Sequence, residues 1–187
     1  MLKRIFDIFL ALLASLLLLP VFLATFALVR FTSAGPVLYW SDRVGKNNQI
    51  FKMPKFRSML IDTPAVATHL LQNPNAHLTP VGSFLRKTSL DELPQLWSIL
   101  KGDMSFVGPR PALYNQEDLI SMRSALGIDR LVPGLTGWAQ IHGRDELDIP
   151  AKVDLDHHYL LKQSFGLDMQ ILWLTAIQVI RSEGVSH

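Results

Sequence analysis

Residues 8–29 read IFLALLASLLLLPVFLATFALV, a run without a charged side chain. As a helix rising ~1.5 Å per residue, the run would extend roughly 33 Å, which is enough to cross a hydrocarbon core. Pro20 lies in the middle, where a proline removes a backbone hydrogen bond and favours a kink. The stretch therefore predicts a membrane helix that breaks at Pro20.

The charges at the two ends of this run leave its topology open. Lys3 and Arg4 flank one end, and Arg30 and Arg43 follow the other. Cationic flanks favour the cytoplasmic side, so a segment with two of them enters and turns back, unless it spans despite the proline. A cleaved signal peptide fits less well, because the run is long and lacks a small-residue cleavage site. Asp7 is costly at depth, so we expect it at the interface or paired with a cation.

The composition limits the kinds of site and partner that the protein can have. The chain has 187 residues and no cysteine, which excludes disulfides, thiolate nucleophiles and cysteine-based metal sites. A net charge of +2 is too small an excess to indicate a nucleic-acid partner. The hydrophobic content of 49% is concentrated at the N-terminus. We therefore expect a membrane segment over residues 1–31 and one compact domain over residues 32–187.

The compact domain has signals for both helices and strands. Two β-like runs at 37–40 and 49–53 flank a Gly-Lys-Asn-Asn turn, which predicts a short hairpin. Residues 62–80 read as a loop with one short helix, and the Gly- and Pro-rich segments 102–111 and 132–143 read as loops. Helices are expected over residues 81–86, 93–100, 117–126, 154–163 and 167–181.

The last predicted helix has only a narrow polar stripe. It is either a buried core helix or an interfacial helix that lies among lipid headgroups, with Trp173 at their level.

Asp91 and Glu92 form an acidic pair near the middle of the chain. Pro94 is favoured in the first turn of a helix, which places both carboxylates at a helix N-terminus. One interpretation is a capping box between Ser89 and Glu92. The other is a site of mixed charge, because Arg86 lies just upstream.

Two arginines strengthen the second interpretation. Arg110 lies between two prolines, so a stiff backbone places its fork of donors for a phosphate, unless it only pairs with Asp103. Arg144 follows the second glycine-rich segment, where glycines let a backbone approach a ligand closely. A carboxylate beside such cations can attack phosphorus, and magnesium is the natural metal for oxygen ligands.

Further candidate groups lie near the C-terminus. Asp156 and Asp168 are carboxylates that would complete such a site, although helix capping or solvation is preferred for Asp168. His157 and His158 follow one another on a predicted helix, where neighbouring side chains diverge by about 100°, so we prefer an exposed or lipid-facing helix to a metal site there.

The chain resembles the bacterial sugar transferases, small monotopic phosphoglycosyl transferases that begin glycan assembly on undecaprenyl phosphate. The resemblance covers essentially the whole chain. It rests on SLDELPQ at 89–95, KGDMSFVGPRP at 101–111, PGLTGWAQ at 133–140 and FKMPKFRSM at 51–59.

The resemblance implies a reaction and roles for the site residues. A UDP-sugar would donate a phosphosugar to Asp91, release UMP, and pass the phosphosugar to undecaprenyl phosphate in a ping-pong sequence. Glu92 would activate or position the acceptor phosphate, and Mg²⁺ would lie near Asp91. Binding of phosphate or nucleotide would fall to these residues: Lys55, Arg86, Arg110, Arg144 and Asp156.

The resemblance also implies the setting of the site. The family fold is α/β-associated and mostly helical, with a re-entrant membrane helix in one leaflet, a short β-hairpin and interfacial amphipathic helices around a cytoplasmic active site. The enzyme would lie on the cytoplasmic face of the bacterial inner membrane. The family helix bends at a Ser-Pro pair, and the matching pair here is Leu19-Pro20.

Two other functions use the same residues. A membrane-anchored hydrolase of pyrophosphate lipids would use water as the acceptor, but such two-metal enzymes need a dense His/Asp cluster, which the sequence lacks. A binding module without catalysis would use the acidic pair only as a helix cap. The sugar, the pathway and the oligomeric state, including a homo-oligomer, stay open.

Overall fold

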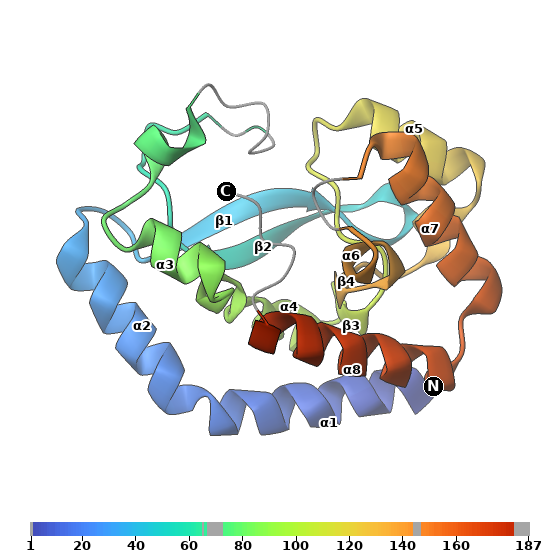
Figure 1. Ribbon diagram of the computed structural model, residues 1–187, viewed down its shortest axis with the longest axis horizontal. Coiled ribbons are helices and arrows are strands. Elements are labelled where there is room, and N and C mark those ends of the chain that lie inside the picture. The colour runs from blue at the N-terminus through green and yellow to red at the C-terminus, as the bar shows by residue number, and fades with distance from the viewer. Residues whose placement is uncertain (1, 65, 67–72, 144–146, 182–187) are drawn as a thin grey trace.

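The computed structural model describes residues 2–64, 66, 73–143 and 147–181, apart from the side chains of residues 180 and 181. The described chain is mostly helical, as predicted, and has two small sheets (Figure 1). Its α-helices are α1 Leu2–Leu17, α2 Leu19–Thr32, α3 Gly82–Lys87, α4 Gln95–Lys101, α5 Glu117–Ala125, α6 Trp138–Ile141, α7 Ile149–Lys162 and α8 Phe165–Arg181. Its strands are β1 Leu38–Val44, β2 Ile50–Phe56, β3 Ser105–Val107 and β4 Gly134–Thr136.

The two N-terminal helices meet at a bend of 63° (Figure 1). Pro20 lies in the first turn of α2, where its missing N–H needs no intrahelical partner. The N–H of Leu18 still donates to Ala14 and that of Phe22 to Leu18, so hydrogen bonds continue across the bend. Within the described ranges no single helix is long and apolar enough to cross a membrane, but this bent pair is, by length and composition alone. The predicted break beside Pro20 is confirmed.

The first turns of α1 are tied into the folded domain. Arg4 donates to the backbone oxygens of Ile99 (2.5 Å) and Leu100 (2.7 Å), near the end of α4, where a cation complements unpaired carbonyls. Asp7 is 3% exposed and accepts the N–H of Phe106 at 3.1 Å. The partner of Asp7 is thus a buried backbone amide in place of the expected cation, and its expected position at the membrane interface stays a prediction.

Asp168 holds α8 against the start of α1. Its carboxylate accepts a hydrogen bond from Lys3 Nζ at 2.6 Å and another from the Tyr159 hydroxyl at 2.6 Å. Burial, together with the bond to Asp168, raises the pKa of Tyr159, which keeps the hydroxyl protonated. Asp168 is 3% exposed, so the preferred interpretation of a capping or solvated side chain is wrong.

The sheets were only half predicted. Strands β1 and β2 form the expected antiparallel hairpin, with Leu38 opposite Phe56 and Val44 opposite Ile50. Strands β3 and β4 pair in parallel inside the two segments expected to be loops. A Cβ on Gly134 would lie 2.1 Å from the backbone nitrogen of Gly108, so glycine permits this close backbone contact. The glycines thus serve chain packing at this point.

The five predicted helices are all present as α3, α4, α5, α7 and α8. Helix α7 begins earlier than expected, because Asp148 accepts the N–H of Ala151 at 2.9 Å and Pro150 occupies the first turn. The loop at 62–80 contains a short 3₁₀ helix, Pro74–His77, among its described residues.

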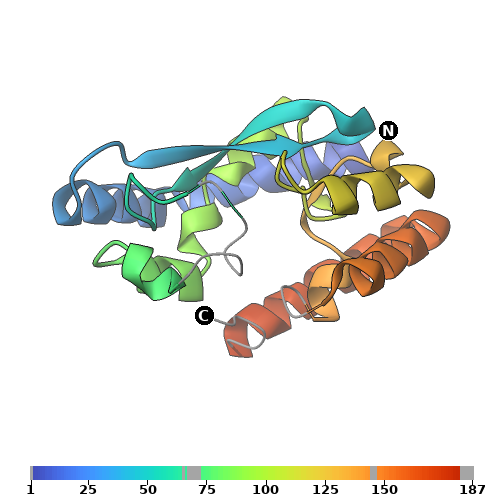
Figure 2. The same ribbon diagram turned by 90° about the horizontal axis from the view of Figure 1, so that it is seen from above.

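Helix α8 is buried on one side and exposed on the other. Ile171 is fully buried in the main core, whereas Trp173 is 69% exposed. The predicted core interpretation is confirmed for the buried face, and the interfacial interpretation of the exposed face stays a prediction. Seen from above, the hairpin lies along one long side of the molecule and α7 and α8 lie along the opposite side (Figure 2).

Candidate functional site

Asp91 and Glu92 lie in a short 3₁₀ turn, Leu90–Glu92, between α3 and α4. Ser89 precedes the turn with a φ of 55°, in the left-handed region, and its side chain makes no capping bond. Helix α4 begins only after Pro94. The predicted capping box is therefore wrong, and both carboxylates are available for other contacts.

Glu92 is held by two cations. Its Oε1 accepts one hydrogen bond from Lys55 Nζ and one from Arg110 Nη2, each at 2.8 Å. Burial acts to raise the pKa of Glu92, but Arg110 and Lys55 outweigh it and hold that pKa well below its usual range. Asp103, the alternative partner considered for Arg110, pairs instead with Lys101 at 2.9 Å.

Asp91, directly before Glu92 in the chain, is buried without such partners among the described residues. It is 7% exposed and has no hydrogen-bond or ion-pair partner within the part of the chain that the structure describes. Burial raises the pKa of Asp91 from 3.8 to about 6, against the nearby charges of Lys55 and Arg86. Two neighbouring carboxylates whose environments push their pKa values apart are a signature of divided chemical roles.

The cations around Asp91 come from separate parts of the chain. Lys55 lies on β2, Arg86 on α3 and Arg110 on the loop that follows β3. All three lower the pKa of Asp91, so each lies within electrostatic reach of it. Arg144, the fourth predicted phosphate ligand, lies outside the described residues. The three described cations suit a phosphate or diphosphate substrate placed against Asp91.

Asp156 joins the site through Arg123, which was not among the predicted site residues. Arg123 donates from Nε (3.0 Å) and Nη2 (2.5 Å) to Asp156 Oδ2, and from Nη1 (2.9 Å) to the backbone oxygen of Arg110. Arg123 and Asp156 are 8% and 1% exposed. The pair thus fixes the backbone that presents Arg110 to Glu92. Arg123 follows the buried Leu119 by one helical turn, and a cation on an apolar helix face is a signal for such a role.

His158 contacts an aromatic side chain. Its ring stacks on Trp138 of α6, with centroids 5.3 Å apart and planes inclined by 18°. His142 also contacts Trp138, at 4.3 Å between centroids. Over the described ranges, no group of three or more His, Cys, Asp or Glu side chains is arranged to hold a metal ion.

The sequence profile of the bacterial sugar transferases matches residues 1–182. The chain belongs to the bacterial sugar transferases. Among its relatives, the exopolysaccharide production protein ExoY of Sinorhizobium fredii is 39% identical over 97% of this chain and 87% of its own length.

Two further relatives of this sugar transferase carry names that state a reaction. UDP-N-acetylgalactosamine-undecaprenyl-phosphate N-acetylgalactosaminephosphotransferase of Aeromonas hydrophila is 37% identical over 97% of this chain. UDP-glucose:undecaprenyl-phosphate glucose-1-phosphate transferase of Escherichia coli is 39% identical over 95% of it. The chain covers 44% and 40% of these two longer proteins.

Proposed function

We propose that this sugar transferase moves a sugar phosphate from a UDP-sugar to undecaprenyl phosphate and releases UMP. Two relatives at 37% and 39% identity are named for such transfers, and the matches cover 97% and 95% of this chain. Their names differ in the sugar, so the sugar of this enzyme stays open. The cationic site beside Asp91 suits the diphosphate of the donor and the phosphate of the acceptor.

The contrast between Asp91 and Glu92 carries the proposed mechanism. A carboxylate oxygen of Asp91 attacks the phosphorus next to the sugar, a new O–P bond forms, and the bond to UMP breaks with its electron pair on UMP. A phosphate oxygen of the acceptor then attacks the same phosphorus and frees Asp91. Asp91 suits this role because no protein group binds its oxygens in the described chain.

Glu92 suits a positioning role. Its Oε1 is already shared by Lys55 and Arg110, so it holds two cations toward the phosphates that Asp91 would attack. This assignment extends the role implied by the family resemblance, which connects Glu92 with the acceptor phosphate alone.

Magnesium fits the donor set around Asp91. Mg²⁺ commonly binds one or two carboxylates together with substrate phosphates, and Asp91 is a buried carboxylate without a protein partner among the described residues. Asp91 would hold the ion, which would neutralise charge on the donor phosphates when bound. Glu92 Oε1, with its two cationic partners, suits a metal less well.

The nucleotide product tests the proposed function. The purified enzyme in detergent is incubated with Mg²⁺ and a panel of UDP-sugars, with and without undecaprenyl phosphate. We expect one equivalent of UMP without the acceptor and repeated turnover with it. Release of UDP, or of free sugar phosphate at the same rate without the acceptor, would contradict the proposal and indicate another transferase or a hydrolase.

The bent helix pair suits a re-entrant membrane segment on the cytoplasmic face of the inner membrane. Both ends of the pair carry cations, and the bend of 63° turns α2 away from the line of α1. The chain has no cysteine, so single cysteines placed at Leu2 and Ala34 report the side of each end. In sealed inverted vesicles we expect a membrane-impermeant maleimide to label both. Labelling of only one position would indicate a spanning helix.

Arg123→Lys should lower kcat about tenfold while the folded enzyme stays stable. A lysine cannot reproduce the forked contact that joins Asp156 to the backbone of Arg110, so Arg110 loses its fixed position. Steady-state kinetics and thermal melting in detergent measure the two effects, with the exposed Arg130→Lys as the control. A lower Tm with an unchanged kcat would assign Arg123 a purely structural role.

The donor half-reaction should depend on pH through Asp91. Its pKa of about 6 means that the attacking carboxylate becomes protonated below this pH. We expect kcat/KM for the donor in UMP release without acceptor, which reports the free enzyme, to be level above pH 7 and to fall about tenfold per unit well below pH 6. An ordinary aspartate would keep the rate level to about pH 5. A level profile down to pH 5 would show that the titration of Asp91 does not limit the step.

A further inference from the structure

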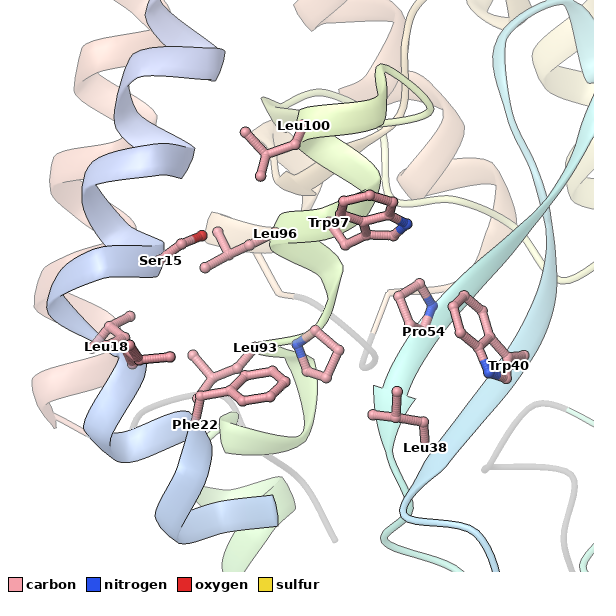
Figure 3. Close-up of a pocket in the computed structure, with 12 residues that line it drawn as sticks. Ser15, Leu18, Phe22, Leu38, Trp40, Pro54, Leu93, Leu96, Trp97 and Leu100 are labelled. Atoms are coloured by element: carbon pink, nitrogen blue, oxygen red, sulfur yellow. The ribbon is translucent and has the colours of Figure 1, made fainter.

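An apolar groove of about 450 Å³ lies between the α1–α2 bend, helix α4 and the hairpin. Figure 3 shows α4 between the other two elements, with the labelled side chains of all three around a shared space. Ser15 is the one polar residue among the described residues that line it; the apolar ones include Leu18, Phe22, Trp40 and Trp97. Its volume lies within the range of about 300–1,000 Å³ that is typical of ligand pockets.

The groove borders the cationic site along two of its walls. On α4 and the turn before it, Leu93 and Pro94 line the groove directly after Glu92. On the hairpin, Pro54 lines it directly before Lys55, whose Nζ donates to Glu92. An apolar groove whose lining residues adjoin a cation cluster along the chain complements a molecule with a phosphate head and an apolar chain.

We propose that this groove binds the part of the acceptor's hydrocarbon chain that adjoins its phosphate. The inference rests on the proposed function, which supplies a polyprenyl phosphate as the acceptor. The donor is a poor occupant, because a nucleotide sugar has no apolar chain to exchange for water in the groove. The groove is too small for a long polyprenyl chain, so the distal units remain among the lipids.

The rim of the groove suits the surface of a bilayer. Trp40 is 47% exposed on the hairpin and Trp97 is 60% exposed on α4. Indole rings favour the boundary between headgroups and hydrocarbon, where one edge is apolar and the other is wet. A lipid phosphate bound by Lys55 and Arg110 would keep the adjoining part of its chain beside these rings and out of water.

Binding of the hydrocarbon chain in the groove can be weakened without altering the residues of the cationic site. Trp97→Ala and Trp40→Ala each remove an exposed ring from the rim, and Trp173→Ala removes a ring of similar exposure from α8, away from the groove. We expect each rim variant to raise the KM for undecaprenyl phosphate about tenfold, because apolar contact is lost. The amount of UMP released without acceptor should not change, and Trp173→Ala should behave as the wild type in both assays.

Photocrosslinking provides a measurement that needs no turnover. The probe is an undecaprenyl phosphate analogue with a diazirine on the isoprene unit next to the phosphate. We expect its adducts on residues 93–100 and 38–54, and fewer of them in both rim variants. Adducts confined to α8 or to the outer face of α1 would overturn the proposal, as would an unchanged KM in both rim variants or an equal rise in Trp173→Ala.

The two assays separate failure of the groove from failure of the proposed function. UMP release without adducts at the groove would overturn the groove and leave the transfer reaction standing. Adducts at the groove without UMP release would refute the transfer reaction, and with it the identity of the groove's occupant as the acceptor. Adducts that an excess of ordinary phospholipid abolishes would assign the groove to a membrane lipid and overturn the proposal.

Discussion

Asp91→Asn should reduce transfer by at least about 10⁴-fold, the loss typical when one member of a covalent catalytic unit is removed. An amide cannot form the acyl phosphate through which the phosphosugar passes, although it occupies the same volume. UMP release without acceptor should disappear as well, because that release is the first half of the reaction. Radiolabelled sugar transfer into lipid and UMP formation measure the two losses separately.

The same substitution should not destabilise the protein at neutral pH. The raised pKa of Asp91 means that the folded state binds its proton more tightly than the unfolded state between about pH 4 and pH 6. The ionised carboxylate therefore costs stability above pH 6, and asparagine removes that cost. We expect a Tm at pH 7.5 equal to or above that of the wild type, with the difference lost near pH 4. An inactive variant with a lower Tm would favour a structural role for Asp91.

Glu92→Gln should lower kcat/KM about 10²–10³-fold, the size of effect seen when a preorganised electrostatic contact is lost. Glutamine is neutral and turns either an amide N–H or a weaker acceptor toward Lys55 and Arg110, so the two cations lose their common anchor. Steady-state kinetics measure the loss, and the exposed Glu117→Gln on α5 provides a matched control that should keep full activity.

The two half-reactions distinguish the roles open to Glu92. If Glu92 positions cations for both phosphates, UMP release without acceptor slows together with overall transfer. If it acts only on the acceptor phosphate, UMP release stays at the wild-type rate and only transfer slows. The second result would contradict the positioning role that we assign to Glu92.

Local signals predicted the parts of the fold that local physics determines. The break beside Pro20 and the hairpin around Gly45 follow from residues that restrict or free the backbone at one position. Strands β3 and β4 have three residues each, too few for an alternating pattern, and they form because Gly108 and Gly134 allow two distant backbones to touch. Neither segment has a hydrophobic pattern from which this strand pairing could be predicted.

The candidate site, like the fold, could be predicted from the sequence only in part. The acidic pair and the stiff loop around Arg110 are visible in sequence, but the difference between Asp91 and Glu92 is not. It depends on Lys55, which lies 37 positions before Glu92 and reaches it only when β2 packs beside the turn. Arg123 reaches the backbone of Arg110 across 13 positions. Tertiary contacts of this kind select which of two neighbouring carboxylates stays without a partner.

The ties between α1 and the folded domain are a further case. Asp7 looks like a cost of burying a charge in a membrane, yet it accepts the N–H of Phe106 inside the protein. The apolar residues around Asp7 in the sequence predict a membrane segment. The opposite face of α1, with Phe9 and Leu16, is indeed exposed. One helix thus serves both the core and the apolar outer surface, and composition alone does not separate these faces.

Mass spectrometry of the enzyme after exposure to its UDP-sugar, without acceptor, tests the covalent role of Asp91 most directly. We predict a mass increase equal to one phosphosugar, carried by the peptide that contains Asp91 and removed when undecaprenyl phosphate is added. The Asp91→Asn variant should show no increase. Full turnover without any adduct, or an adduct on Glu92 in place of Asp91, would contradict the account.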